Sequence, residues 1–144
     1  MYKRESLGIE EAKVAIEAIL GEALKKPAQP IAVAVMDDRG GLICYARMNG
    51  ANQFNETMSL RKARTASLIG IDTSVFGQAL LSLKINISDF GGCDVTIVPG
   101  GVSVSKPGGG PVVGSIGVSG RMAEEDEILA RVGLEVLKGS NKPG

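Results

Sequence analysis

The chain has 144 residues, of which 44% are hydrophobic and 3% aromatic, and its 16 basic residues balance 16 acidic ones. This length fits one domain, and the balanced charge without a basic cluster argues against a nucleic-acid-binding surface. There is no histidine. Its absence excludes Ser-His-Asp and Cys-His catalysis, imidazole-ligated zinc and a haem iron held by a proximal histidine.

The N-terminal segment indicates where in the cell the protein is expected. Residues 1–11 turn acidic and amphipathic where a secretory signal needs an apolar region, and no stretch approaches the roughly 20 apolar residues of a membrane span. A cytoplasmic protein without membrane association is expected.

Cys44 and Cys93 are too far apart for a CxxC motif and too few for a structural zinc site. We therefore expect two buried free thiols and no metal site.

The first predicted element is an amphipathic helix. Apolar residues recur at spacings of three and four between Ile9 and Ala23, and charged residues occupy the other face. Ser6 is the expected N-cap, and Pro27 prevents the helix from continuing. This helix should serve as scaffold.

A β-hairpin is predicted next, with strands at residues 31–36 and 42–48 joined by a glycine-containing turn. Because side chains alternate along a strand, Tyr45 and Arg47 should project together beside a polar loop that begins at Asn49. Either these residues orient a polar ligand, or the strand is half exposed and its arginine is solvated.

Two helices should follow. Residues 56–70 have helical periodicity closed by Gly70, and a shorter helix should run from the capping residue Asp72 to about Leu83. Lys62 falls within the apolar stripe of the first of these helices. Its ammonium group either extends to the surface or points into a pocket.

The pattern then changes to short β-type runs separated by glycine-rich turns. The predicted strands are residues 95–98, 102–105 and 112–118. After Ser119 and Gly120, acidic residues begin an amphipathic helix that reaches Leu137, where their charge complements the helix dipole. Residues 139–144 should form a flexible tail.

The predicted order is α-β-β-α-(α)-β-β-β-α, which describes a single α+β domain over residues 1–138. In this domain a five-stranded antiparallel sheet is flanked by the N- and C-terminal helices. The glycines of residues 107–120 do not match a phosphate loop or a dinucleotide fingerprint. Tight turns and close packing of helix on sheet explain them better.

Several short motifs occur in a fixed order along the chain. They are Asp37-x-x-Gly40-x-Leu42, Tyr45-Ala46-Arg47-Met48-Asn49-Gly50-Ala51, Lys62-Ala63-Arg64-Thr65-Ala66, Val113-Gly114-x-Ile116-Gly117-Val118-Ser119-Gly120 and Glu124-x-Asp126. Together they resemble the GlcG/HbpS-like family, also called DUF336, a haem-degrading and PduO C-terminal-like family. The resemblance implies a profilin-like fold, assembly into homo-oligomers and, in some members, binding of haem or association with cobalamin-linked enzymes.

The chain also departs from this family. Members often have a histidine directly before the leucine of the second hairpin strand, where this chain has Gly41. Haem is therefore a possible but disfavoured ligand, and Cys44, Tyr45 or Met48 would have to hold its iron. The loop at residues 106–111 replaces a short hairpin, which implies a reshaped pocket mouth.

Three functions remain open at this stage. The first is a ligand-binding, homo-oligomeric domain with a pocket for a small anionic or tetrapyrrole-type molecule, its cofactor otherwise unknown. The residues expected to bind the ligand are Tyr45, Arg47, Asn49, Lys62, Gly100, Gly101, Ser119 and Gly120.

The second function is a cofactor-free isomerase, lyase or hydratase that acts on a small oxygenated metabolite. Lys62, Asp126 or Glu56 would then serve as the catalytic base, and Arg47 would polarise a carbonyl group. The third function is an accessory subunit without a ligand of its own.

Overall fold

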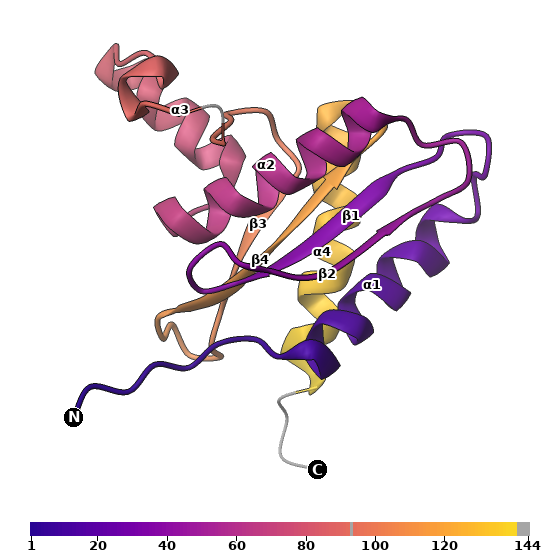
Figure 1. Ribbon diagram of the computed structural model, residues 1–144, viewed down its shortest axis with the longest axis horizontal. Helices are drawn as coiled ribbons and strands as arrows, with labels where there is room; N and C mark the ends of the chain where they lie inside the picture. The colour runs from indigo at the N-terminus through magenta and orange to yellow at the C-terminus, as the bar shows by residue number, and fades with distance from the viewer. Residues whose placement is uncertain (93, 141–144) are drawn as a thin grey trace.

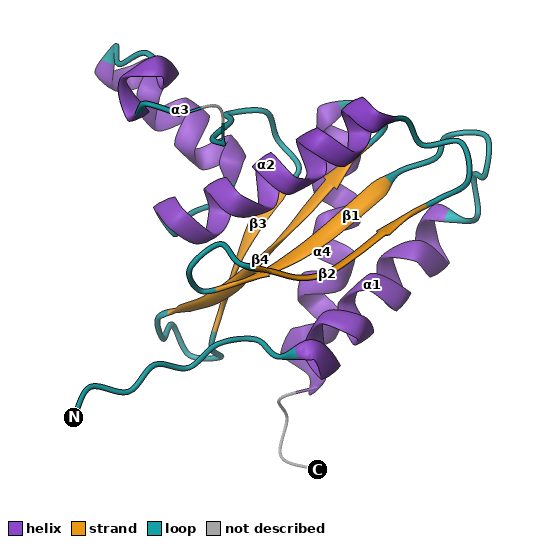
Figure 2. Cartoon of the chain, in the orientation of Figure 1, coloured by secondary structure: helices purple, strands orange, loops and turns teal. Residues whose placement is uncertain are grey.

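The computed structural model describes residues 1–92 and 94–140, so the predicted thiol state of Cys93 lies outside the described residues. An antiparallel four-stranded sheet of order β2-β1-β4-β3 carries helices on both faces (Figure 1). The strands are β1 (Ala32–Asp37), β2 (Leu42–Arg47), β3 (Gly101–Ser105) and β4 (Val112–Ser119). The helices are α1 (Ile9–Ala23), α2 (Gln53–Ile69), α3 (Thr73–Leu83) and α4 (Ala123–Ser140), with a short 3-10 helix η1 at Ile87–Phe90 (Figure 2).

The two faces of the sheet have different coverings. Helices α1 and α4 pack side by side on one face, and α2 crosses the other (Figure 1). Alternation along the strands turns Val33, Val35 and Ile116 toward α1 and α4, where they join an aliphatic core. Cys44 also packs against this core, on the face expected from the sequence.

Helix α2 lies close to β4 because the facing residues are small. A side chain at Gly117 would collide with the backbone of Ser59 and Ala63. The hydroxyl group of Ser115 donates to the carbonyl of Ala63, and it is also hydrogen-bonded to the hydroxyl of Ser67. The hydroxyl groups of Ser67 and Ser115 are therefore buried on this face with their hydrogen bonds satisfied.

The prediction of a fifth strand at residues 95–98 is wrong. The backbone N–H of Thr96 donates to the hydroxyl of Thr65, and the N–H of Val98 donates to the hydroxyl of Thr96. These donors are satisfied by side chains, so the segment crosses α2 and α3 without joining the sheet. Tertiary contacts have overridden the β-propensity of the run.

The ends of the outer helices differ slightly from the prediction. Helix α1 ends at Ala23 as expected, but its N-cap is Gly8. Ser6 instead donates from its hydroxyl group to the carbonyl of Val113, which fastens the N-terminal segment to β4. Helix α4 runs to Ser140, so Gly139 is still helical, and residues 141–144 lie outside the described part of the chain.

Helix α2 starts earlier than predicted and ends where expected. The side chain of Asn52 accepts from the N–H of Asn55, so the helix begins before Glu56. Gly70 ends it with a φ of 84°. No single helix of the described chain is long and apolar enough to span a membrane; α2 and α3 meet these criteria only as a pair bent by 68°.

Candidate functional site

A buried ion pair joins α2 to the start of α4. The Nζ atom of Lys62 lies 3.0 Å from Oδ2 of Asp126, and each side chain is only 2% exposed. Nζ also donates to the carbonyl oxygen of Val118, at 2.9 Å. The sequence left open whether Lys62 reaches the surface or points inward, and the structure places its ammonium inside.

The turn between β4 and α4 holds Asp126 in place. Its Oδ1 atom accepts from the backbone N–H of Arg121, at 2.9 Å. The guanidinium group of Arg121 in turn donates to the carbonyls of Ala23 and Gln29. The end of α1 therefore fixes the turn that presents the carboxylate to Lys62.

The environment of the pair disfavours both charges. Burial lowers the pKa of Lys62, although attraction to Asp126 opposes the shift. Burial likewise raises the pKa of Asp126 against the attraction of Lys62 and its hydrogen bonds. Titratable groups shifted in this way, and in direct hydrogen-bond contact, are suited to proton transfer.

Glycines make room for the lysine. A side chain at Gly100, whose φ is 129°, would come within 2.8 Å of Nζ of Lys62 and 2.6 Å of the carbonyl oxygen of Val118. A side chain at Gly101 would collide with the carbonyl of Lys62, and one at Gly120, whose φ is 150°, with that of Pro30. These glycines are required by close packing and by positive φ.

A cavity of about 200 Å³ opens at this pair. Its polar lining includes Lys62, Asp126 and Ser119, and its apolar lining includes Phe54, Met58 and Val98. The lining residues are Phe54, Asn55, Met58, Lys62, Val98, Ser119, Gly120, Arg121, Ala123 and Asp126. A few polar groups converging in an apolar hollow are typical of a small-molecule site.

The structure leaves six of the predicted site residues outside this lining. Arg47 and Ser119 both pair with Ala32 and so share the α2 face, but about two strand spacings, roughly 10 Å, separate them. Arg47 is exposed at the end of β2, Asn49 is exposed just after it, and Glu56 is half-buried in the first turn of α2. Of the predicted glycines, Gly120 lines the cavity, whereas Gly100 and Gly101 pack behind Lys62.

Tyr45 also lies outside the cavity lining. It packs beside Ala34 and Met36 under α2, and its hydroxyl group is buried without a hydrogen-bond partner among the described residues. Burial is the main reason that its pKa is raised, and the charge of Glu56 adds to the shift.

Sequence reasoning expected the helix of Lys62 to border the pocket but did not name Phe54 and Met58 as lining residues. Phe54 and Met58 precede Lys62 at intervals of four residues, so all three lie on one side of the helix and line the cavity. This spacing is visible in the sequence and could have identified them. The pairing of Lys62 with Asp126 could not be seen, because it joins residues 64 positions apart.

The described residues do not fit a haem held through iron in this cavity. The sulfur of Met48 accepts from the N–H of Ile31 inside the core, and Cys44 packs on the opposite face of the sheet. Tyr45 is buried beneath α2. None of the three predicted iron ligands reaches the cavity lining, and the chain has no histidine.

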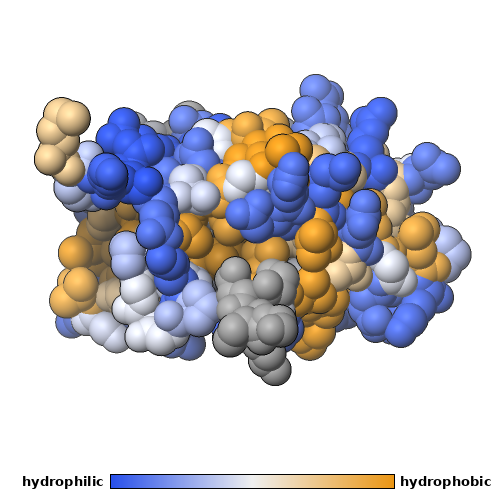
Figure 3. All heavy atoms as spheres, turned by 90° about the horizontal axis from the view of Figure 1, so that it is seen from below, coloured by the Kyte–Doolittle hydropathy of each residue, from blue (hydrophilic) through white to orange (hydrophobic). Residues whose placement is uncertain are grey.

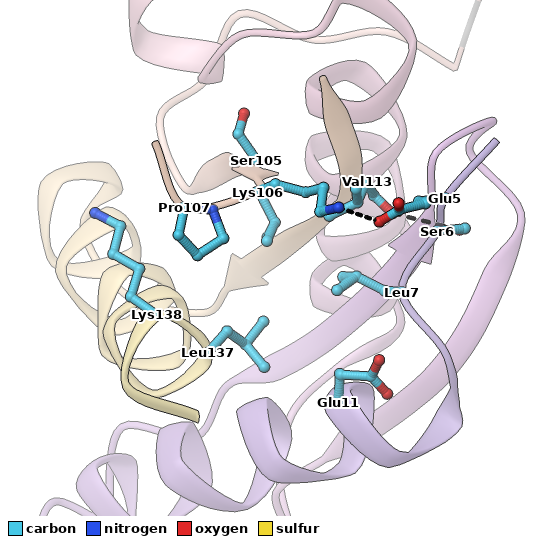
Figure 4. Close-up of a pocket in the computed structure, with 11 residues that line it drawn as sticks. Glu5, Ser6, Leu7, Glu11, Ser105, Lys106, Pro107, Val113, Leu137 and Lys138 are labelled. Atoms are coloured by element: carbon cyan, nitrogen blue, oxygen red, sulfur yellow. Dashed lines mark hydrogen bonds and ion pairs between the residues drawn. The ribbon is translucent and has the colours of Figure 1, made fainter. Parts of the chain in front are cut away.

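A further cavity, of about 330 Å³, lies at the other end of β4 (Figure 4). The loop at residues 106–111, expected at the pocket mouth, reaches this end and not Lys62. Lys106 and Glu5 point toward each other here, but their side chains are 45% and 65% exposed. Water screens such a pair, so this cavity lacks the buried polar chemistry of the Lys62 cavity.

Fold and site together define an α+β domain with a sheet covered on both faces and a small polar cavity where β4 meets α4. A comparison with protein families gives the identity: residues 7–135 match the model described as "Haem degrading protein HbpS-like". The chain belongs to the HbpS-like family, as its motifs predicted.

Solved structures agree with this assignment. A double mutant of HbpS from Streptomyces reticuli is 30% identical, with a TM-score of 0.83 over 95% of this chain and 90% of that chain. Klebsiella pneumoniae protein ORFY is 22% identical, with a TM-score of 0.85 over 95% and 94% of the two chains, and supports the fold alone. So does PduOC in complex with heme, at 19% identity and a TM-score of 0.80 over 91% and 94%.

A curated relative comes from Citrobacter freundii. It is an uncharacterized 15.0 kDa protein of the dhaT-dhaS intergenic region, 29% identical over 130 residues, which cover 86% of this chain and 87% of the relative.

Proposed function

We propose that the protein binds a small oxygenated molecule in the cavity lined by Lys62, Ser119 and Asp126. The observation that carries this proposal is the buried Lys62–Asp126 pair, which is open to the cavity although both residues are almost fully buried. A buried ion pair contributes little to stability compared with apolar residues of the same volume. Its presence at a cavity is therefore better explained by a ligand than by folding.

The size and chemistry of the cavity narrow the class of ligand. At about 200 Å³ it is smaller than the pockets that enclose drug-sized molecules, which hold roughly 300–1,000 Å³. A short carboxylate or hydroxy-carbonyl compound would fit, with its oxygen atoms directed to Lys62 and Ser119. The binding of heme by PduOC does not transfer readily, because a tetrapyrrole would have to lie outside this cavity.

Acid–base catalysis on such a ligand is the second candidate function. It is favoured by the direct 3.0 Å hydrogen bond between Lys62 and Asp126, because their opposed pKa shifts bring the two protonation states closer in energy. Of the predicted bases, Lys62 and Asp126 line the cavity and Glu56 does not. Arg47 is too distant to polarise a carbonyl group held by Lys62.

We also infer that the protein forms a homo-oligomer through the rim of this cavity. Phe54 and Met122 are 66% and 69% exposed, and they flank cavity-lining residues of α2 and α4. On the face that Figure 3 shows, by contrast, hydrophilic side chains lie between the apolar areas. Exposed apolar groups beside a site are typical of an interface.

Light scattering at several protein concentrations tests the assembly. The wild type should exceed its monomer mass, whereas Phe54→Ser should be monomeric with an unchanged fold. Leu42→Ser is the matched control, because Leu42 is 51% exposed on the edge strand β2, away from this rim. Monomeric wild-type protein would contradict the inferred assembly.

Methyl NMR tests ligand binding directly. Met58 lines the cavity and Met36 is fully buried under α2, so the first methyl group reports on the cavity and the second on the fold. Titration with pyruvate, glycolate and glycolaldehyde should shift the Met58 methyl signal and leave that of Met36 in place. Absence of a Met58 shift with every probe would refute the proposed function.

A further inference from the structure

The hydrogen bonds of Lys62 leave one direction at Nζ for a ligand. Two acceptors surround the nitrogen: the carbonyl oxygen of Val118 at 2.9 Å and Oδ2 of Asp126 at 3.0 Å. A lysine nitrogen is tetrahedral and carries three hydrogen-bonding positions in addition to its carbon. Once the ammonium has given a proton to Oδ2 of Asp126, its new lone pair points at that oxygen, and rotation about the Cε–Nζ bond brings the lone pair to the remaining position.

Asp126 can accept the proton that the Lys62 ammonium must lose to become a neutral amine. Its Oδ2 atom is in direct contact with Nζ, and its Oδ1 atom is held by the N–H of Arg121, so the carboxyl group cannot easily turn away. Among the described residues lining the cavity, the other charged group is Arg121, whose guanidinium is engaged by backbone carbonyls of the α1 end. The proton therefore has one short route, from Lys62 to Asp126.

We propose that Lys62 is a nucleophile that forms an imine with small aldehydes or ketones in this cavity. The inference rests on the proposed ligand site and assigns it a substrate class. Val118 and Asp126 orient the amine, and Phe54, Met58 and Ala123 provide an apolar wall against which the bound carbonyl compound can pack.

The reaction balances without a cofactor. Nζ of Lys62 attacks the carbonyl carbon after giving one proton to Asp126, and the C=O bond becomes a C–O bond that takes this proton. The resulting carbinolamine then loses its hydroxyl group together with the second amine proton, as one molecule of water. The products are a protonated imine at Lys62 and water, Asp126 is again a carboxylate, and hydrolysis reverses the sequence.

Burial helps the attack at neutral pH. An exposed lysine is almost entirely protonated there, and each unit by which its pKa falls raises the neutral fraction about tenfold. Burial lowers the pKa of Lys62, whereas Lys25 is 69% exposed. Lys62 should therefore react faster than Lys25 with a carbonyl compound that enters the cavity.

Reductive trapping of the wild-type protein tests this inference. The protein is incubated with glycolaldehyde and sodium cyanoborohydride at pH 6.5, and alkylation at each lysine is followed by peptide mass spectrometry. Alkylation of Lys62 should be at least tenfold faster than that of Lys25 in the same sample. Prior addition of glycolate, as a competing ligand without a reactive carbonyl, should slow alkylation of Lys62 and not of Lys25.

Two variants separate the roles of the carboxylates. Asp126→Asn keeps the shape of the side chain but removes the group that carries the proton to the carbonyl oxygen. Loss of its charge also lowers the pKa of Lys62 further, but without a proton carrier the carbinolamine cannot form by this route, so trapping at Lys62 should slow at least tenfold. Glu124→Gln removes an exposed carboxylate from the same turn of α4 and should leave the rate unchanged.

The result that would overturn the inference is distinct from failure of the site itself. Alkylation of Lys25 without alkylation of Lys62, while glycolaldehyde still shifts the Met58 methyl signal, would show a binding site that forms no imine. If neither Lys62 alkylation nor a Met58 shift occurs with any probe, the imine and the proposed ligand site are both wrong.

Discussion

The two faces of the sheet show how differently one domain can use its interior. Between the sheet and helices α1 and α4, branched aliphatic residues such as Val33, Ile116 and Leu134 fill a uniform core. Between the sheet and α2, glycine, alanine and serine make the close contacts beside Met36 and Tyr45, and a buried ion pair lies at one end. The first face stabilises the fold, and the second positions the cavity.

Substitutions in the buried Lys62–Asp126 pair should cause the largest loss of stability. Lys62→Met and Asp126→Leu each leave an uncompensated charge inside, so each should lower the free energy of unfolding by about 3–5 kcal/mol. The double variant should regain most of this loss, because neither charge remains. Urea denaturation of the four proteins measures the coupling.

A surface pair provides the control. Lys25 and Glu22 pair within 2.8 Å but are 69% and 47% exposed, so Lys25→Met should change stability by less than about 1 kcal/mol. If the Lys62 and Asp126 single variants changed the free energy of unfolding as little as Lys25→Met does, the pair would not be buried as described.

These comparisons also show what the sequence could reveal. The aliphatic face was predictable from the periodicity of α1 and the alternation of the strands, because local patterns report which side of an element is apolar. The apolar stripe that contains Lys62 was also visible in the sequence, but the direction in which the Lys62 side chain points was not. That direction depends on Gly100, Val118 and Asp126, which come from distant parts of the chain and meet only in the folded domain.

The prediction of a fifth strand was wrong for the same reason. Residues 95–98 have β-type composition, yet the hydroxyl groups of Thr65 and Thr96 satisfy their backbone donors. A side-chain acceptor on α2 competes with a neighbouring strand, and single-sequence propensity carries no information about that competitor.

A substitution that disturbs the close packing on the α2 face should have the next largest effect on stability. Gly117→Ala places a methyl group against the backbone of Ser59 and Ala63, so it should lower the free energy of unfolding by about 1–3 kcal/mol or more. Gly21→Ala in α1 is the matched control, because nothing lies within 4 Å of the added carbon. There, alanine should stabilise the helix by about 0.5–1 kcal/mol, and thermal or urea unfolding measures both changes.

The pH dependence of the pair should be the smallest of the three effects. The pKa of Lys62 is lowered from 10.5, so the penalty for its buried charge persists at neutral pH and is relieved as the pH rises toward 10.5. The pKa of Asp126 is raised from 3.8, so its penalty is absent below 3.8 and develops as the pH rises through the folded-state value. Relative to the Lys62→Met/Asp126→Leu variant, the wild type should be least stable near neutral pH.

Denaturation of both proteins at pH 4, 7 and 10 measures this difference, and all other titrating groups cancel because the two proteins share them. A maximum of relative stability near pH 7 would show that mutual attraction of the two charges outweighs their burial.

A crystal structure with a bound probe tests the central claim most directly. Crystals are soaked with whichever of pyruvate, glycolate or glycolaldehyde shifts the Met58 methyl signal most. We predict density for the probe between Met58, Ser119 and the Lys62–Asp126 pair, with an oxygen atom or a covalent bond at Nζ of Lys62. Density for the probe only in the cavity beside Lys106 and Leu7, with the Lys62 cavity holding none, would contradict the assignment of the site.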